Sequence, residues 1–130
     1  MLKIAGSGPS SKEIDWVDIA TKKRSVPSKF VYCCYPFHFE KWGTGGELFL
    51  HDRKLNKYYA QFVRSKRPPQ RMKPSLGLCA VLGAHARFNI SEVGLIGFDY
   101  ILDGNTEWEH DAIAEKACIE SLVRIIDLRT

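Results

Sequence analysis

The stretch Leu2-Lys3-Ile4-Ala5-Gly6-Ser7-Gly8-Pro9-Ser10 decides the expected fold. A short apolar run leads into a turn rich in glycine, and Ser10-Ser11-Lys12-Glu13 then has the composition of a helix start. A strand that ends in such a turn leaves backbone N–H groups free at a helix N-terminus, which suits a phosphate or another anion. We therefore expect a mononucleotide-type α/β fold whose ligand lies beyond the carboxyl ends of the strands.

Length and composition are those of one globular domain. The chain has 130 residues, of which 45% are hydrophobic and 26% charged. It holds no apolar run of about 18 residues, and its start does not resemble a signal peptide. We expect a cytoplasmic protein, either free or peripheral to a membrane. The cysteines form no CxxC pair, so we expect reduced core residues rather than a zinc site; they are Cys33, Cys34, Cys79 and Cys118.

Apolar periodicity and turn residues divide the chain into alternating strands and helices. Strands are expected at residues 2–5, 30–34, 47–51 (after a turn at 43–46) and 93–98. Helices are expected at residues 13–20, 54–63, 75–86 and 110–126, with loops at 22–29 and 99–109. This alternation predicts one α/β domain over residues 1–130, a Rossmann-like three-layer structure with a mostly parallel sheet and right-handed crossovers.

Two turns are candidates for a binding site. The first is Gly6-Ser7-Gly8, and the second is Lys73-Pro74-Ser75-Leu76-Gly77, which also precedes a helix. Two helix N-termini of this kind can flank one ligand cleft; the alternative is a pair of purely structural turns. The third glycine of the dinucleotide fingerprint is missing, so an NAD-dependent enzyme is not expected.

His110 is the candidate for a catalytic base. It stands at the head of the last expected helix, where the helix dipole favours the neutral imidazole that a general base requires. The neighbouring carboxylates Glu107, Glu109 and Asp111 favour the charged form instead, and the sequence leaves this balance open. The alternative is a surface histidine near a helix cap. We expect structural or surface roles for the other histidines, and no pair of histidines has a metal-ligand spacing; they are His38, His51 and His85.

The basic residues concentrate in Arg53–Lys73, which contains no acid. They are Arg53, Lys54, Lys57, Arg64, Lys66, Arg67, Arg71 and Lys73. This stretch is either a solvated loop or an electropositive rim that attracts phosphates, an acidic glycan or nucleic acid. Its aromatic residues Tyr58, Tyr59 and Phe62 recur at helical spacing, which favours core packing over base stacking.

Three segments together resemble the bacterial sialyltransferases of the Campylobacter lipooligosaccharide type. The first runs from Ile4 to Asp15, and the family has an asparagine where Ser7 stands. The second comprises 74–81 and 93–100, which look like the family's central helix and following strand. The third begins at His110, which matches the family's catalytic histidine, and extends to Leu122. The chain is about half as long as the family members, and Arg64–Lys73 replaces the family's lid region.

The resemblance implies a glycosyltransferase that uses a CMP-sugar donor, needs neither metal nor cofactor, and inverts the anomeric centre by direct displacement. It places these residues at the nucleotide and donor: Gly6, Ser7, Gly8, Ser10, Ser75, Gly77 and Tyr100. It assigns His110 to deprotonation of the acceptor hydroxyl. From their charge, we expect Lys73 and Arg71 to face the phosphate or the acceptor.

The expected function is therefore transfer of a sugar, sialic acid by the resemblance, from a nucleotide-sugar to the hydroxyl of a glycan or another acceptor. One alternative is a module that binds a nucleotide or sugar-nucleotide without catalysis. Another is a basic accessory protein that binds nucleic acid through Arg53–Lys73. A chain this short could also need a second copy or another subunit to complete its cleft.

Overall fold

The computed structural model of the chain describes residues 1–21, 26–37, 39, 46–64 and 69–130. Parts of the expected loop at 22–29 and of the expected turn at 43–46 lie outside these residues, as do His38, Lys66 and Arg67.

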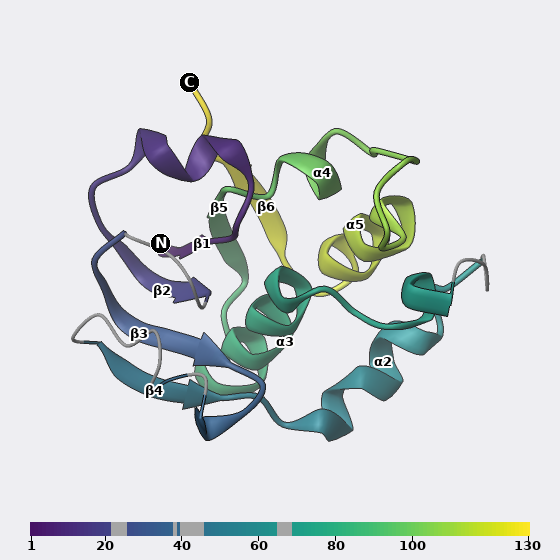
Figure 1. Cartoon of the computed structure of the whole chain (residues 1–130), viewed down its shortest axis with the longest axis horizontal. Coiled ribbons are helices and arrows are strands. Elements are labelled where there is room, and N and C mark those ends of the chain that lie inside the picture. Colours follow the sequence, from purple (N-terminus) through teal and green to yellow (C-terminus); the bar gives the residue numbers. More distant parts are fainter. Residues whose placement is uncertain (22–25, 38, 40–45, 65–68) are drawn as a thin grey trace.

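The described residues form one six-stranded sheet in which every neighbouring pair of strands is parallel. The strands are β1 (Leu2–Ala5), β2 (Val17–Thr21), β3 (Ser28–Cys33), β4 (Glu47–Leu50), β5 (Glu92–Ile96) and β6 (Arg124–Asp127). Their order across the sheet is β4-β3-β2-β1-β5-β6 (Figure 1). The predicted α/β class and Rossmann-like architecture are confirmed.

Helical segments connect the strands. They are the 3₁₀ helices η1 (Pro9–Glu13), η2 (Arg53–Leu55) and η3 (Pro69–Met72) and the α-helices α2 (Asn56–Ala60), α3 (Leu76–Phe88), α4 (Asp99–Leu102) and α5 (Ala112–Glu120). Figure 1 shows α2, α3 and α5 grouped on one side of the strands. The expected helix at 75–86 is confirmed as α3, which ends at Asn89 in the left-handed conformation (φ 51°, ψ 47°). The expected helix at 54–63 is observed as η2 followed by the shorter α2.

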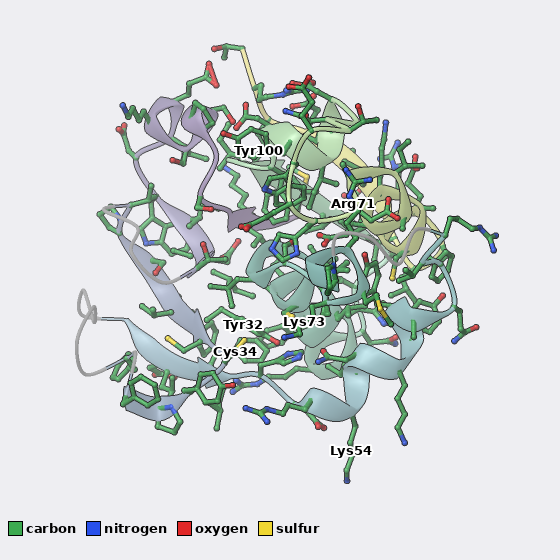
Figure 2. The ribbon with its side chains drawn as sticks, turned by 45° about the vertical axis from the view of Figure 1, so that its right-hand side comes forward. Tyr32, Cys34, Lys54, Arg71, Lys73 and Tyr100 are labelled. Atoms are coloured by element: carbon green, nitrogen blue, oxygen red, sulfur yellow. The ribbon has the colours of Figure 1, made fainter. Side chains whose placement is uncertain are left out.

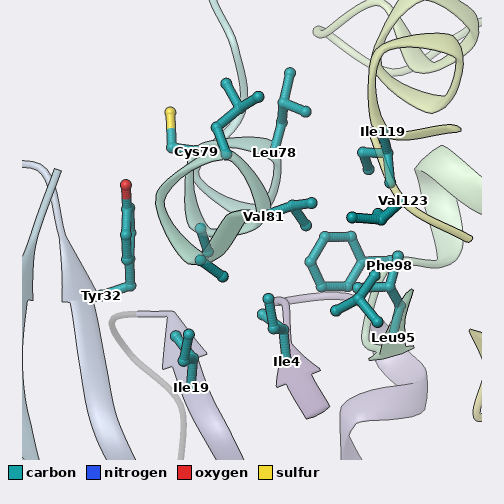
Figure 3. Close-up of a cluster of buried hydrophobic side chains, with 14 of the residues drawn as sticks. Ile4, Ile19, Tyr32, Leu78, Cys79, Val81, Leu95, Phe98, Ile119 and Val123 are labelled. Carbon is teal, nitrogen blue, oxygen red and sulfur yellow. The ribbon is translucent and has the colours of Figure 1, made fainter. Parts of the chain in front are cut away.

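Both faces of the sheet are covered by apolar side chains. The larger cluster lies between the sheet and the helices, where Ile4 and Ile19 of the strands join Val81 of α3 (Figure 3). A smaller cluster occupies the opposite face, beneath Ile14 and Leu128; its members are Ala5, Val17, Ala20, Val26 and Ile96. Adjacent residues such as Ile4 and Ala5 enter different clusters because successive side chains of a strand point to opposite faces.

The prediction of a helix at residues 13–20 is wrong. Val17–Thr21 forms β2, which pairs with β1 in the register Ile4↔Ile19 and Ala5↔Ala20. A strand buried on both faces does not alternate between apolar and polar residues, so its pattern resembles a helical face. The β-branched Val17 and Ile19 favour the strand, and Trp16 is 48% exposed rather than part of a buried stripe.

The prediction of one helix over 110–126 is also wrong. α5 ends at Glu120, and Arg124–Asp127 forms β6 against β5, with Val93 paired to Ile125. Apolar residues recur on both sides of the boundary, at Ile119, at 122–123 and at 125–126, so composition alone conceals it. The predicted loop at 99–109 begins with the four-residue helix α4.

The end of β1 and the end of β5 are in direct backbone contact. The Gly6 N–H donates to the Ile96 carbonyl at 2.8 Å, and the Gly8 N–H donates to the Gly97 carbonyl at 2.7 Å. The chain passes from β1 toward β4 on one side and from β5 to β6 on the other, so this contact marks the point where the strand order reverses. Open α/β sheets bind their ligands in the crevice at such a point.

Substitution at Gly97 tests how much the fold depends on this contact. Gly97 has φ +74°, and a Cβ atom there would lie 2.5 Å from the Gly6 carbonyl oxygen. We expect Gly97→Ala to lower the free energy of unfolding by about 2–4 kcal/mol. Gly104 is the matched control, because its φ is +64° but a Cβ atom added there would have no neighbouring atom within 4 Å. Gly104→Ala should cost only about 1–2 kcal/mol. If urea unfolding shows the same loss of unfolding free energy in both variants, the contact with Gly6 adds nothing to the cost at Gly97.

Candidate functional site

A cleft of about 480 Å³ lies at the carboxyl ends of β1 and β5. Its lining residues come from the ends of three strands, the start of α3, and the segment from α4 to α5. They are Gly6, Ser7, Gly8, Thr21, Ser75, Leu76, Gly77, Gly97, Phe98, Tyr100, Ile101, Trp108, Glu109 and His110. The structure therefore brings both predicted turns, Tyr100 and His110 to one cleft, whereas Ser10, Arg71 and Lys73 are not among its lining residues.

One end of the cleft is built from backbone. Ser75 is the N-cap of α3, and its hydroxyl accepts from the Leu78 N–H at 3.2 Å. The N–H groups of Leu76 and Gly77 belong to the first helical turn, which offers them no intrahelical acceptor, and both residues line the cleft. A Cβ atom on Gly77 would lie 3.0 Å from the Phe98 ring, so glycine permits α3 to start this close to the end of β5. This end suits an anionic group.

His110 also lines the cleft. Its Nδ1 lies 3.1 Å from the Lys73 carbonyl oxygen. A carbonyl only accepts hydrogen bonds, so Nδ1 carries the proton and the neutral ring keeps Nε2 as its basic atom. The nearest acid to Nε2 is Glu109, whose Oε1 is 3.9 Å away on a largely exposed side chain. The ring can therefore accept a proton at Nε2.

Glu115 is a buried acid behind the cleft. It is fully buried on α5, and its Oε2 accepts from the Ser75 N–H at 2.9 Å while its Oε1 is hydrogen-bonded to the Ser75 hydroxyl. The same Oε2 lies 4.0 Å from Nδ1 of His110. Burial raises the pKa of Glu115 from its ordinary value of 4.5 to about 8; the hydrogen bonds from Ser75 oppose this shift, and the charge of Asp111 adds to it.

Aromatic rings form a continuous row along one wall. The rings of Tyr100 and Trp108 stack with their centroids 5.5 Å apart, and Trp108 meets His110 edge to face at 4.9 Å. This wall can pack against a flat or apolar face of a ligand and holds the imidazole ring in place.

Three residues predicted for the site have structural contacts instead. The Ser10 hydroxyl donates to Asp99 at 2.9 Å and accepts from the Gly97 N–H at 2.8 Å, so it fastens η1 to the end of β5. The Arg71 guanidinium donates to the Thr106 carbonyl, which ties η3 to the loop before His110. Lys73 has an exposed side chain and contributes its carbonyl to His110.

The aromatic residues in the described part of Arg53–Lys73 pack toward the core. Tyr59 is fully buried, and Tyr58 and Phe62 pack against the core, as predicted. Lys54 projects from the start of the α2 region, at the opposite end of the molecule from Tyr100 (Figure 2). None of the described basic residues of Arg53–Lys73 lines the cleft.

His51 and the four cysteines have the roles expected of core groups. His51 is buried and joins the Tyr32 hydroxyl (2.5 Å) to the Asn56 side chain (2.7 Å), which confirms its predicted structural role. Cys33, Cys79 and Cys118 are buried and Cys34 is half-buried, and none of the four forms a disulfide within the described residues.

The described residues supply neither a metal cluster nor a membrane-spanning helix. In that part of the chain, no three acidic, histidine or cysteine side chains gather as a metal site. Nor does any described helix have the length and apolar character needed to cross a membrane.

Several residues of the cleft escape prediction from the sequence. Trp108 lies in a polar loop with no periodic pattern, and Glu115 is only one of several polar residues in the last helix. Phe98 follows the buried strand β5 after Gly97, and this position can indicate a cleft residue because parallel strands end at the cleft. Glu115 falls in the first turn after Asp111, whose side chain caps α5 by accepting from the Ala114 N–H at 3.0 Å. That turn faces α3 only because of the tertiary packing.

The raised pKa of Glu115 predicts a pH dependence of stability. Between pH 4.5 and about 8 the folded state keeps a proton that the unfolded state has released. The wild-type free energy of unfolding should therefore fall as pH rises through this window, by up to about 1.4 kcal/mol per pH unit. Glu115→Gln removes the titrating group and should flatten the curve measured by urea unfolding at pH 5, 6, 7 and 8. Glu120→Gln, an exposed change on the same helix, is the control. A curve for Glu115→Gln as steep as that of the wild type would contradict this assignment.

Comparisons with known proteins yield no match: no model of a protein family fits the chain, and neither a curated protein nor a solved structure is significantly similar to it. The function of the cleft must therefore be argued from its own residues.

Proposed function

We propose that the cleft transfers a glycosyl group from a nucleotide-sugar donor to an acceptor hydroxyl, with His110 as the general base. The observation that carries the proposal is the 3.1 Å contact between Nδ1 of His110 and the Lys73 carbonyl oxygen, which assigns the proton of the neutral ring to Nδ1. Its Nδ1–H is held by the Lys73 carbonyl, so Nε2 is the basic atom in the same cleft that receives the first N–H groups of α3. A base and an anion-binding helix start are the two elements that displacement of a nucleotide requires.

The reaction is a single displacement. As the acceptor oxygen forms its bond to the anomeric carbon, its proton passes to Nε2 of His110. The bond between the anomeric carbon and the phosphate oxygen breaks, and its electron pair leaves with the nucleotide phosphate. Negative charge grows on that phosphate, and the oriented N–H groups of Leu76 and Gly77 at the start of α3 can stabilise it without reorganising. The protonated imidazole later returns its proton to solvent.

The donor would lie with its phosphate at the glycine turn and at the start of α3. This places the nucleotide at the reversal of the strand order, as in other open α/β sheets. A CMP-sugar, with sialic acid as the sugar, is the donor that the sequence resemblance favours. The proposed reaction uses side chains and backbone alone, without a metal or a cofactor.

A non-catalytic sugar-nucleotide binder is the second candidate. Among the described residues that line the cleft, neither a lysine nor an arginine occurs. Stabilisation of a departing phosphate therefore falls on backbone dipoles, which suffice for binding but offer less to a developing charge than a cation does.

A histidine substitution separates the two candidates. Wild type and His110→Ala are incubated with a panel of CMP-, UDP- and GDP-sugars, and the ligand-induced change in Tm is measured beside transfer or hydrolysis of the donor. We expect His110→Ala to keep the change in Tm and to lose transfer by about 10²–10⁴-fold. His85→Ala, on α3 outside the cleft, is the matched control and should transfer like the wild type.

The outcomes distinguish the hypotheses. Transfer by His110→Ala at the wild-type rate would eliminate His110 as the base. Binding without transfer in the wild type would favour the non-catalytic binder. If no sugar-nucleotide changes the Tm of the wild type, both candidates fail.

A further inference from the structure

Glu115 joins the two helix starts that frame the cleft. It lies in the first turn of α5, and both of its carboxyl oxygens contact Ser75, the N-cap of α3. One oxygen accepts the Ser75 N–H, which would otherwise be an unpaired group of that helix start. The contact therefore fixes the position of α3 relative to α5, and with it the N–H groups of Leu76 and Gly77.

The same carboxyl group adjoins the proposed base. Oε2 of Glu115 lies 4.0 Å from Nδ1 of His110, whose ring is also held by the Lys73 carbonyl and by the edge of Trp108. A single buried side chain thus contacts both the start of α3, through Ser75, and the ring of His110.

We infer that Glu115 is a positioning residue which holds the start of α3 in place and, when ionised, stabilises the imidazolium form of His110. This inference rests on the proposed function for its kinetic consequence. Its geometric part, the interaction between Glu115 and His110, does not depend on the substrate.

The chemistry follows from where the proton goes. When Nε2 of His110 takes the acceptor proton, the ring becomes positively charged, and a carboxylate 4.0 Å away in a buried setting lowers the energy of that charge. A protonated Glu115 would give little such help. In either state the hydrogen bond to Ser75 persists, because the hydroxyl can donate to the ionised oxygen or accept from the protonated one.

The pKa of each thiol and phenol that interacts electrostatically with Glu115 is raised. Tyr59 of α2, Cys79 of α3 and Cys118 of α5 interact electrostatically with Glu115. Burial raises the pKa of Cys118 to about 12, and burial also raises the pKa of Tyr59. The pKa of Cys79 is raised by its hydrogen bond with Cys34 and by burial. The remaining charged neighbour is Asp111, which caps α5.

The kinetic test compares Glu115→Gln with the wild type between pH 6 and pH 9.5. Glutamine keeps the size and the hydrogen bonds to Ser75 but not the charge. We expect kcat for transfer to be within about 3-fold of the wild type at pH 6, where Glu115 is protonated. Above pH 8 the kcat of Glu115→Gln should be about 10–100-fold lower than that of the wild type, with the donor KM nearly unchanged. Glu115→Asp retains the charge and should recover part of the alkaline kcat, and Glu120→Gln should follow the wild type throughout.

A second measurement does not need activity. The imidazole signals of His110, assigned by their loss in His110→Ala, are followed by NMR as the pH is raised. In the wild type they should show an additional step near pH 8, where Glu115 ionises, and Glu115→Gln should abolish that step. Identical single-step curves in both proteins would overturn the inference.

The two measurements also separate this inference from the proposed function. If the wild type transfers no sugar, the proposed function fails, and the imidazole titration alone decides whether Glu115 acts on His110. If the wild type transfers sugar and Glu115→Gln has the same pH profile, the inference fails while the proposed function stands.

Discussion

The backbone contact between the Gly6–Gly8 turn and Gly97 is the constraint on which the rest of the structure depends. It extends the pairing of β1 and β5 beyond the last residues of both strands, at distances that leave no room for a side chain. Because backbone rather than side chains forms this part of the surface, small residues line the cleft there. Ser10 and Asp99 then tie η1 to the same place. The cleft is therefore an outcome of how the central strands end.

The cleft combines this rigid backbone with a costly polar interior. A fully buried carboxyl group such as Glu115 lowers stability unless it is hydrogen-bonded or neutral, and here it is hydrogen-bonded to Ser75 through both oxygens. An apolar residue at this position could pack α5 against α3 without that cost. An apolar residue could not, however, hold the Ser75 N–H or interact with a charged imidazole. A buried carboxyl group stabilises the fold less than an apolar residue would at this position, and this difference in stability is consistent with a role of Glu115 in the cleft.

The net charge of +4 gives little information about this site. The described basic residues lie mainly outside the cleft, and Arg71 and Lys73 contribute to it indirectly, by bracing a loop and by offering a carbonyl. Recognition of an anion would thus rely on oriented dipoles, which act at short range, more than on long-range attraction.

Sequence reasoning succeeded where a residue's role depends on its immediate neighbours. The strand at 2–5, the helix start at Ser75 and the strand at 93–98 (observed as Glu92–Ile96) follow from local patterns, and all three border the cleft. It failed at Val17–Thr21 and Arg124–Asp127, whose apolar residues fit a helix as well as a strand until sheet pairing selects the strand. It could not find the contact of Glu115 with Ser75, because 40 residues separate the two and only packing brings them together.

The order of the strands also determines when the cleft can form during synthesis. β1 is made first, yet its partner on one side is β5, some 90 residues later in the chain (Leu2 pairs with Val93). Until β5 leaves the ribosome, β1 is the open edge of a four-stranded sheet, with apolar side chains and unpaired backbone groups exposed. Contacts of such long sequence separation are slow to form because loop closure costs entropy before any pairing compensates it. The turn at residues 6–8 is translated well before β5, but it acquires its structure only once β5 pairs with β1.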